Sequence, residues 1–117
     1  MTFRLVTIVR VYLTDHSAQL DPLLRRLHDW ERVRGVTVFH GAAGFGENSG
    51  AGSVKLTAQP LHTPVVVEFF DIPEKISAVL EHVSISIKPR HMVWWNVMMH
   101  DEAVEEDEDE EDGSYEE

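Results

Sequence analysis

The chain has 117 residues, 43% of them apolar, which is enough to bury one hydrophobic core but not two. It contains no cysteine, so disulfides, thiolate metal sites and a cysteine nucleophile are excluded. The net charge of −11 is uneven, because residues 101–117 hold 12 of the 21 acidic residues and no basic one. Residues 1–100 therefore carry 10 basic and 9 acidic side chains, a balance of +1. We expect a nearly neutral domain over residues 1–100 and a disordered acidic tail over 101–117.

The first segment, Phe3–Leu13, is rich in β-branched residues and predicts a strand. Arg4 and Arg10 interrupt its apolar residues. Met1–Leu13 therefore has neither the apolar core of a signal peptide nor the length of a membrane span. We expect a soluble, cytoplasmic protein with no membrane insertion.

The second segment predicts a helix that begins at Leu20 and is stopped by Gly35. Asp21 is placed to cap its first turn, where Pro22 is tolerated because its missing N–H has no partner to lose. The apolar residues that recur with the helical period are Leu20, Leu23, Leu24, Leu27 and Val33.

Two further strands follow, separated by a glycine-rich loop. Gly35–His40 predicts the second strand, and Gly41–Gly52 holds five of the seven glycines and predicts irregular structure. Val65–Phe70 predicts the third strand. It is almost apolar on both faces, so it should lie inside the sheet.

The last two elements are a second helix and a fourth strand. Asp71 and Glu74 have the spacing of a capping box, and an apolar helical stripe then runs to about Val83. Ser84–His91 predicts a loop, and Val93–Met99 predicts the last strand. Trp94 and Trp95 should point to opposite faces of that strand, one under the helices and one in a subunit interface. Stacking of either ring on a base requires a nearby cleft.

The predicted order β-α-β-β-α-β is typical of α+β, ferredoxin-like folds, with a four-stranded antiparallel sheet and both helices on one face. The first, third and fourth strands are apolar on both faces, however. An apolar sheet face left in water is an association site. We therefore expect self-assembly through the sheets, with a copy number that these patterns leave open.

Three segments, Arg10–Leu13, Gly35–Gly46 and Pro64–Asp71, together resemble the PII-like signalling proteins, in particular their short, largely uncharacterised branch. The resemblance spans Phe3–Met99. It implies a ferredoxin-like subunit that forms a homotrimer through its sheets and holds adenine nucleotides in clefts between subunits. It also implies a mobile loop after the second strand and docking onto a protein partner, either a transporter or an enzyme.

The candidate nucleotide-binding residues come from three places: His40, Gly41, Gly44, Phe45 and Gly46; Lys88 and Arg90; and Arg10. The glycines allow backbone N–H groups to approach a phosphate, although a flexible hairpin connection explains them equally well. Lys88 and Arg90 flank Pro89 and are either phosphate ligands or solvated loop charges. Arg10 must pair with an anion, either Glu68 or a ligand. Lys55 is a weaker candidate.

We expect a PII-like regulator that binds AMP, ADP or ATP, without a tightly bound cofactor, and signals through its glycine-rich loop to a partner such as an anion or bicarbonate transporter. The alternative is a nucleotide-independent trimeric docking module, or a metal-binding protein of the copper-tolerance type. The histidines His82, His91 and His100 lack metal-site spacing, so no metal site is predicted. Ser49 and Ser53 lack a supporting base, so no catalytic residue is predicted and an enzyme is not expected. The neutral domain and acidic tail disfavour nucleic acid.

Overall fold

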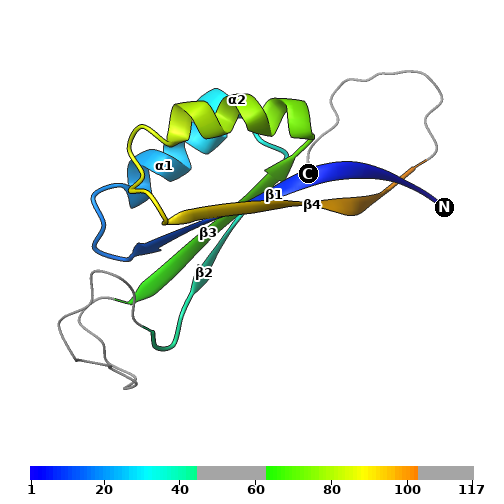
Figure 1. The fold of residues 1–117 in the computed structure, drawn as a ribbon. Helices are drawn as coiled ribbons and strands as arrows, with labels where there is room; N and C mark the ends of the chain where they lie inside the picture. The colour runs from blue at the N-terminus through cyan, green and yellow to red at the C-terminus, as the bar shows by residue number, and fades with distance from the viewer. Residues whose placement is uncertain (45–62, 103–117) are drawn as a thin grey trace.

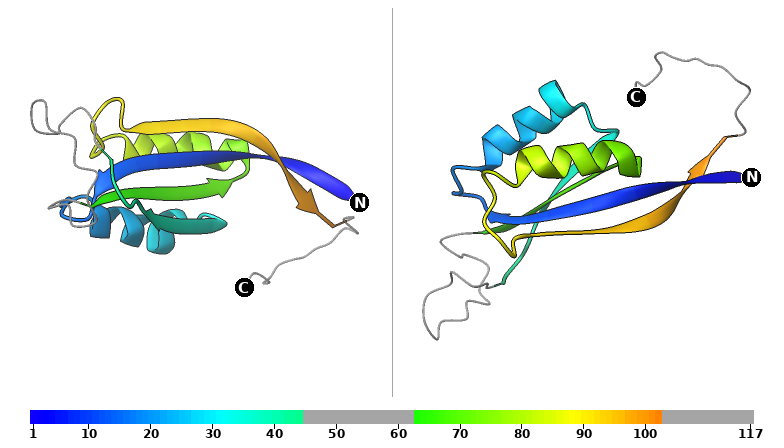
Figure 2. Two further views of the ribbon diagram at one scale, coloured as in Figure 1. Left: turned by 90° about the horizontal axis from the view of Figure 1, so that it is seen from below. Right: turned by 45° about the horizontal axis from the view of Figure 1, so that its top comes forward.

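The computed structural model describes residues 1–44 and 63–102, which form one antiparallel sheet with two helices on one of its faces (Figures 1 and 2). The element order confirms the predicted β-α-β-β-α-β sequence. The elements are β1 (Thr2–Thr14), α1 (Leu20–Arg26) continued by a short π-helical turn η1 (Leu27–Glu31), β2 (Gly35–His40), β3 (Pro64–Asp71), α2 (Pro73–Val83) and β4 (Met92–Asp101).

The strand order is β2-β3-β1-β4, so β3 lies inside the sheet as predicted. In the pairing of β1 with β3, Val9 lies opposite Phe69 and Val11 opposite Val67. These four side chains are fully buried and face the helices. Because side chains alternate along a strand, the residues between them point to the opposite face.

The hydrophobic core lies between the helices and this inner face. Leu23 and Leu27 from the first helical segment, and Ile76, Val79 and Val83 from α2, pack against the buried valines of β1 and β3. Each such side chain contributes about 1.5–3 kcal/mol when it is removed from water. The two short helices cover one face of the sheet, so the opposite face has no helix over it among the described residues.

The first helix ends earlier than the sequence predicts. Its last turn is π-helical, and Arg32 then adopts a left-handed backbone with φ of 54°. The predicted stop, Gly35, instead opens β2, and a Cβ on it would lie 2.6 Å from the Phe70 ring. Glycine therefore allows close packing on Phe70, and the expected helix stop at Gly35 is wrong. The expected Asp21 cap is also wrong, because the N-cap residue is Gln19, which makes no side-chain cap hydrogen bond.

The predicted capping box at α2 is also absent. The N-cap residue of α2 is Ile72, and it makes no side-chain cap hydrogen bond. Asp71 is still paired within β3, and its carboxylate accepts hydrogen bonds from the backbone N–H groups of Arg34 (2.9 Å) and Ile72 (2.8 Å). Lys75 Nζ lies 3.5 Å from the same carboxylate. Asp71 therefore ties the entrance of β2 to the start of α2.

Beyond the four-stranded region, β1 and β4 continue as a two-stranded ribbon (Figure 2). Thr2 pairs with Asp101, so the first residue of the predicted acidic tail is the last residue of β4. The Thr2 hydroxyl donates to the Asp101 carbonyl at 2.7 Å, and Arg4 Nε lies 3.4 Å from the Asp101 carboxylate. These contacts hold the two ends of the described chain together.

Replacing Asp71 with alanine should lower the free energy of unfolding by about 1–3 kcal/mol, because two partly buried N–H groups lose their acceptor. Chemical denaturation followed by circular dichroism measures this change. The matched control is Glu74→Ala, which should change stability by less than about 0.5 kcal/mol because Glu74 is exposed. If Glu74→Ala lowered the free energy of unfolding more than Asp71→Ala, the capping-box prediction would be supported instead.

Candidate functional site

The first group of predicted ligand residues lies where β2 ends beside the start of β3. His40 is the last residue of β2 and pairs with Val65. The Gly41 N–H donates to the Pro64 carbonyl at 2.8 Å, and a Cβ on Gly41 would lie 3.1 Å from the Pro64 ring. Gly44 also lies against Pro64. Phe45, Gly46 and Lys55 lie outside the described residues.

The second group, Lys88 and Arg90, lies in the loop that joins α2 to β4. The Tyr12 N–H donates to the His91 carbonyl at 2.8 Å, which fixes the end of this loop against β1. The His91 N–H donates to the Lys88 carbonyl at 3.2 Å and closes a turn. Within that turn Arg90 has φ of 70°, a left-handed conformation that is uncommon for residues other than glycine.

The two groups lie at the same end of the sheet but at its opposite edges (Figure 1). β1 ends, β2 ends, β3 begins and β4 begins at this end, and β3 and β1 separate β2 from β4. Three strand spacings amount to roughly 14 Å. One copy of the chain therefore does not bring Gly41 and Gly44 together with Lys88 and Arg90.

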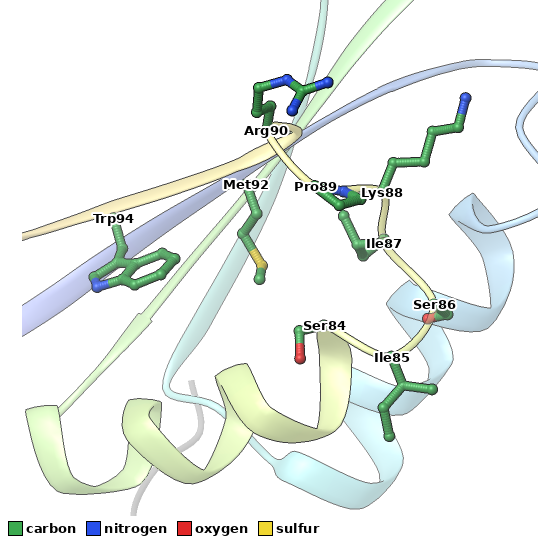
Figure 3. A pocket seen from close by; sticks show the side chains of 9 residues that line it. All are labelled: Ser84, Ile85, Ser86, Ile87, Lys88, Pro89, Arg90, Met92 and Trp94. Atoms are coloured by element: carbon green, nitrogen blue, oxygen red, sulfur yellow. The ribbon is translucent and has the colours of Figure 1, made fainter.

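A hollow of about 570 Å³ lies beneath the α2–β4 loop (Figure 3). Figure 3 shows Trp94, Met92 and Ser84 turned toward this space, whereas Lys88 and Arg90 extend outward from the loop. The remaining lining residues are Ile85, Ser86, Ile87 and Pro89. The hollow thus has an apolar and hydroxyl-bearing interior with cationic side chains at its rim.

The two tryptophans of β4 point to opposite faces, as predicted. Trp94 pairs with Val9 and shares the helix side, whereas Trp95 pairs with Ile8 and shares the other side. Trp94 does not pack under the helices, because β4 is an edge strand; its exposed fraction is 53%. Strand alternation predicts the face of the sheet to which the ring points, but it does not predict whether a helix packs on the ring.

Arg10 lies near the middle of the face that the helices leave open. Its Nε donates to Glu68 Oε1 at 2.8 Å, and its guanidinium carbon lies 5.5 Å from the Trp95 ring centroid and 5.9 Å from that of Phe39. The hydrogen bond to Glu68 raises the pKa of Arg10 above its ordinary value. Of the two partners expected for Arg10, the structure shows Glu68, so its charge is already balanced within the chain.

Three of the described histidines, His16, His28 and His82, each lie beside a carboxylate. His82 Nδ1 lies 2.9 Å from the nearly buried Glu31 carboxylate, which also accepts from Arg26 Nε at 2.8 Å. Among residues 1–44 and 63–102, no three His, Asp or Glu side chains are grouped so as to hold a metal ion. In the same residues, no helix combines the length and hydropathy needed to cross a membrane.

The fold resembles solved PII-like proteins at low sequence identity. The structure of CPII from Thiomonas intermedia K12 bound to ADP, AMP and acetate matches with a TM-score of 0.54 and 12% identity, over 85% of this chain and 90% of that chain. The same protein bound to ADP and bicarbonate matches with a TM-score of 0.51 and 15% identity, over 84% and 89%. A putative PII-like signalling protein from Thermus thermophilus matches with a TM-score of 0.51 and 13% identity, over 85% and 91%.

These likenesses define the chain as a PII-like fold, as the sequence resemblance implies. Residues 6–99 match the family DUF190, described as "Uncharacterized ACR, COG1993". The chain therefore belongs to the DUF190 family. No sequence among the curated proteins matches it.

The left-handed backbone at Arg90 should make the stability of the protein depend on which residue replaces this arginine. Arg90→Gly should be more stable than Arg90→Ala by about 1 kcal/mol, because both variants lose the side chain but only glycine adopts positive φ without a steric penalty. Thermal and chemical denaturation of the two variants measure the difference. Equal stabilities would show that the turn rearranges when Arg90 is replaced.

Proposed function

We propose that the chain is a PII-like regulatory protein that assembles as a homotrimer through its open sheet face and binds an adenine nucleotide in the clefts between copies. The observation that carries the proposal is the split of the candidate ligand residues between two sheet edges at one end of the molecule. A neighbouring copy can bring the α2–β4 loop of one chain to the β2 end of another. Assembly and ligand binding are then parts of one function.

The open sheet face supports the assembly. Tyr12, Phe39, Val93 and Trp95 leave between about two fifths and a half of their surface exposed there, although all are large and apolar or aromatic. Such patches on a small protein mark interaction surfaces. The Arg10–Glu68 pair is already formed at 2.8 Å, so this face can be covered without burying an unpaired charge.

The ligand class follows from the chemistry of the two edges. Lys88 and Arg90 are the kinds of side chain that bind phosphate, and the backbone at Gly41 and Gly44 allows a close approach. CPII, which shares the fold, has been solved with ADP, AMP and bicarbonate. We propose the same nucleotide class for this chain, with His40, Phe45 and Gly46 completing the β2 side and Arg10 anchoring the sheet beneath.

The proposed output is regulation of a protein partner in the cytoplasm, without catalysis. Ordering a glycine-rich segment has a high entropic cost. We propose that ligand binding orders Gly41–Gly52, most of which lies outside the described residues. A partner that binds only one state of this segment then responds to the nucleotide. A bicarbonate or other anion transporter is the partner we propose, since bicarbonate accompanies ADP in CPII.

Isothermal titration with AMP, ADP and ATP, with and without bicarbonate, tests the nucleotide proposal. We expect saturable micromolar binding that Arg90→Ala weakens at least tenfold, because the rim loses a phosphate ligand. The control is Arg25→Ala, which removes an exposed arginine outside the hollow and should leave affinity unchanged. Absence of binding heat with every nucleotide would contradict the proposal.

Analytical ultracentrifugation tests the assembly. The trimer should have a mass of about 40 kDa, three times the 13.4 kDa of one chain. Glu68→Arg should shift it to monomer, because two arginines then meet at the centre of the proposed interface. Glu81→Arg, an exposed change on α2, should leave the mass unchanged. A monomeric wild-type chain would refute the proposed interface.

A further inference from the structure

We propose that the hollow beneath the α2–β4 loop is a base-binding subsite in which Trp94 stacks on the adenine ring and the Ser84 hydroxyl accepts a hydrogen bond from its 6-amino group. This inference rests on the proposed nucleotide binding and adds the location and selectivity of the base. It assigns a role to Trp94, which the proposed phosphate contacts leave unused.

Trp94 has the exposure and position that stacking requires. It lies on the helix side of β4, yet 53% of its surface is accessible, as expected for a side chain on an edge strand. Its side chain points into the hollow rather than along the open sheet face (Figure 3). Aromatic side chains exposed beside a cavity provide a platform for the π-face of a base.

The rest of the hollow suits a planar, largely apolar ring. Ile87 is buried at its inner side, and Met92 lines it with an adaptable thioether chain. Its volume of about 570 Å³ leaves room for a purine ring. No charged side chain points into the space in Figure 3, so the interior favours a base over a phosphate.

The selectivity for adenine comes from the end of α2. Ser84 Oγ donates to the Glu81 carbonyl at 3.2 Å, and Ser86 Oγ donates to the Val83 carbonyl at 3.4 Å. Because both hydroxyl hydrogens are used, the oxygens present lone pairs to a ligand. The 6-amino group of adenine donates to such an acceptor, whereas guanine carries a carbonyl at the same position.

The cations at the rim of the hollow set the direction in which the ribose and phosphates of the nucleotide extend. Lys88 and Arg90 extend outward from the loop that roofs the hollow. A base held at Trp94 therefore places its ribose and phosphates toward the rim, where the two cations lie. This direction leads away from the core.

The test compares ADP and GDP by isothermal titration on the full chain. We expect the wild type to bind ADP at least tenfold more tightly than GDP. Trp94→Leu should weaken ADP binding at least tenfold, and Trp94→Phe should restore most of it by keeping a ring. Ser84→Ala should reduce the preference for ADP over GDP. Trp30→Leu is the control, because Trp30 is 78% exposed and lies outside the hollow.

Tryptophan fluorescence provides a second readout, because Trp94→Phe should still bind ADP by titration and yet lose the quenching. ADP should quench the emission of wild type and of Trp30→Phe, but not that of Trp94→Phe. If Trp94→Leu binds ADP normally while Arg90→Ala does not, the base lies elsewhere and the nucleotide function stands. If the wild type binds neither ADP nor GDP, both proposals fail together.

Discussion

The structure depends on an imbalance between a sheet that is apolar on both faces and two helices that cover one of them. Val9, Val11 and Phe69 are buried beneath the helices, and the opposite face presents Tyr12, Phe39 and Trp95 instead. An ion pair at the centre of that face, Arg10 with Glu68, makes its charges compatible with burial. The uncovered face is the surface through which we propose that copies of the chain assemble.

The strand order links this surface to ligand binding. β2 and β4 form the two edges, and both candidate ligand segments leave the sheet at the same end. An arrangement of this kind cannot close a site within one copy, since two strands intervene. If copies meet through their sheets, edges from different chains become neighbours, and a ligand between them contacts both. In the proposed trimer, the strand order would therefore couple ligand affinity to assembly.

Element types and the interior position of β3 could be predicted, because periodicity, flanking prolines and two-sided apolar character follow from local sequence. The end of the first helix could not, because it is a π-helical turn that ends at Arg32 in a left-handed conformation, which the residue type does not favour. The role of Asp71 likewise depends on Arg34, which is 37 residues away. The glycine-rich segment and the cations of the candidate site were recognised from residue types. The hollow was not, because it forms between the α2–β4 loop and two residues of β4, Met92 and Trp94, whose relative placement depends on the tertiary fold.

The α2–β4 loop joins these features in eight residues. It begins with Ser84 and Ser86, whose hydroxyls are oriented by carbonyls of the last helical turns, and it ends at His91, which is fixed against Tyr12 of β1. Between them, the backbone adopts a left-handed turn at Arg90 although glycine would fit there more easily. A strained residue persists where surrounding contacts hold it, and such residues gather at functional sites. The phosphate contact that we propose for Arg90 would therefore come from a residue whose backbone conformation is held by its neighbours in this turn.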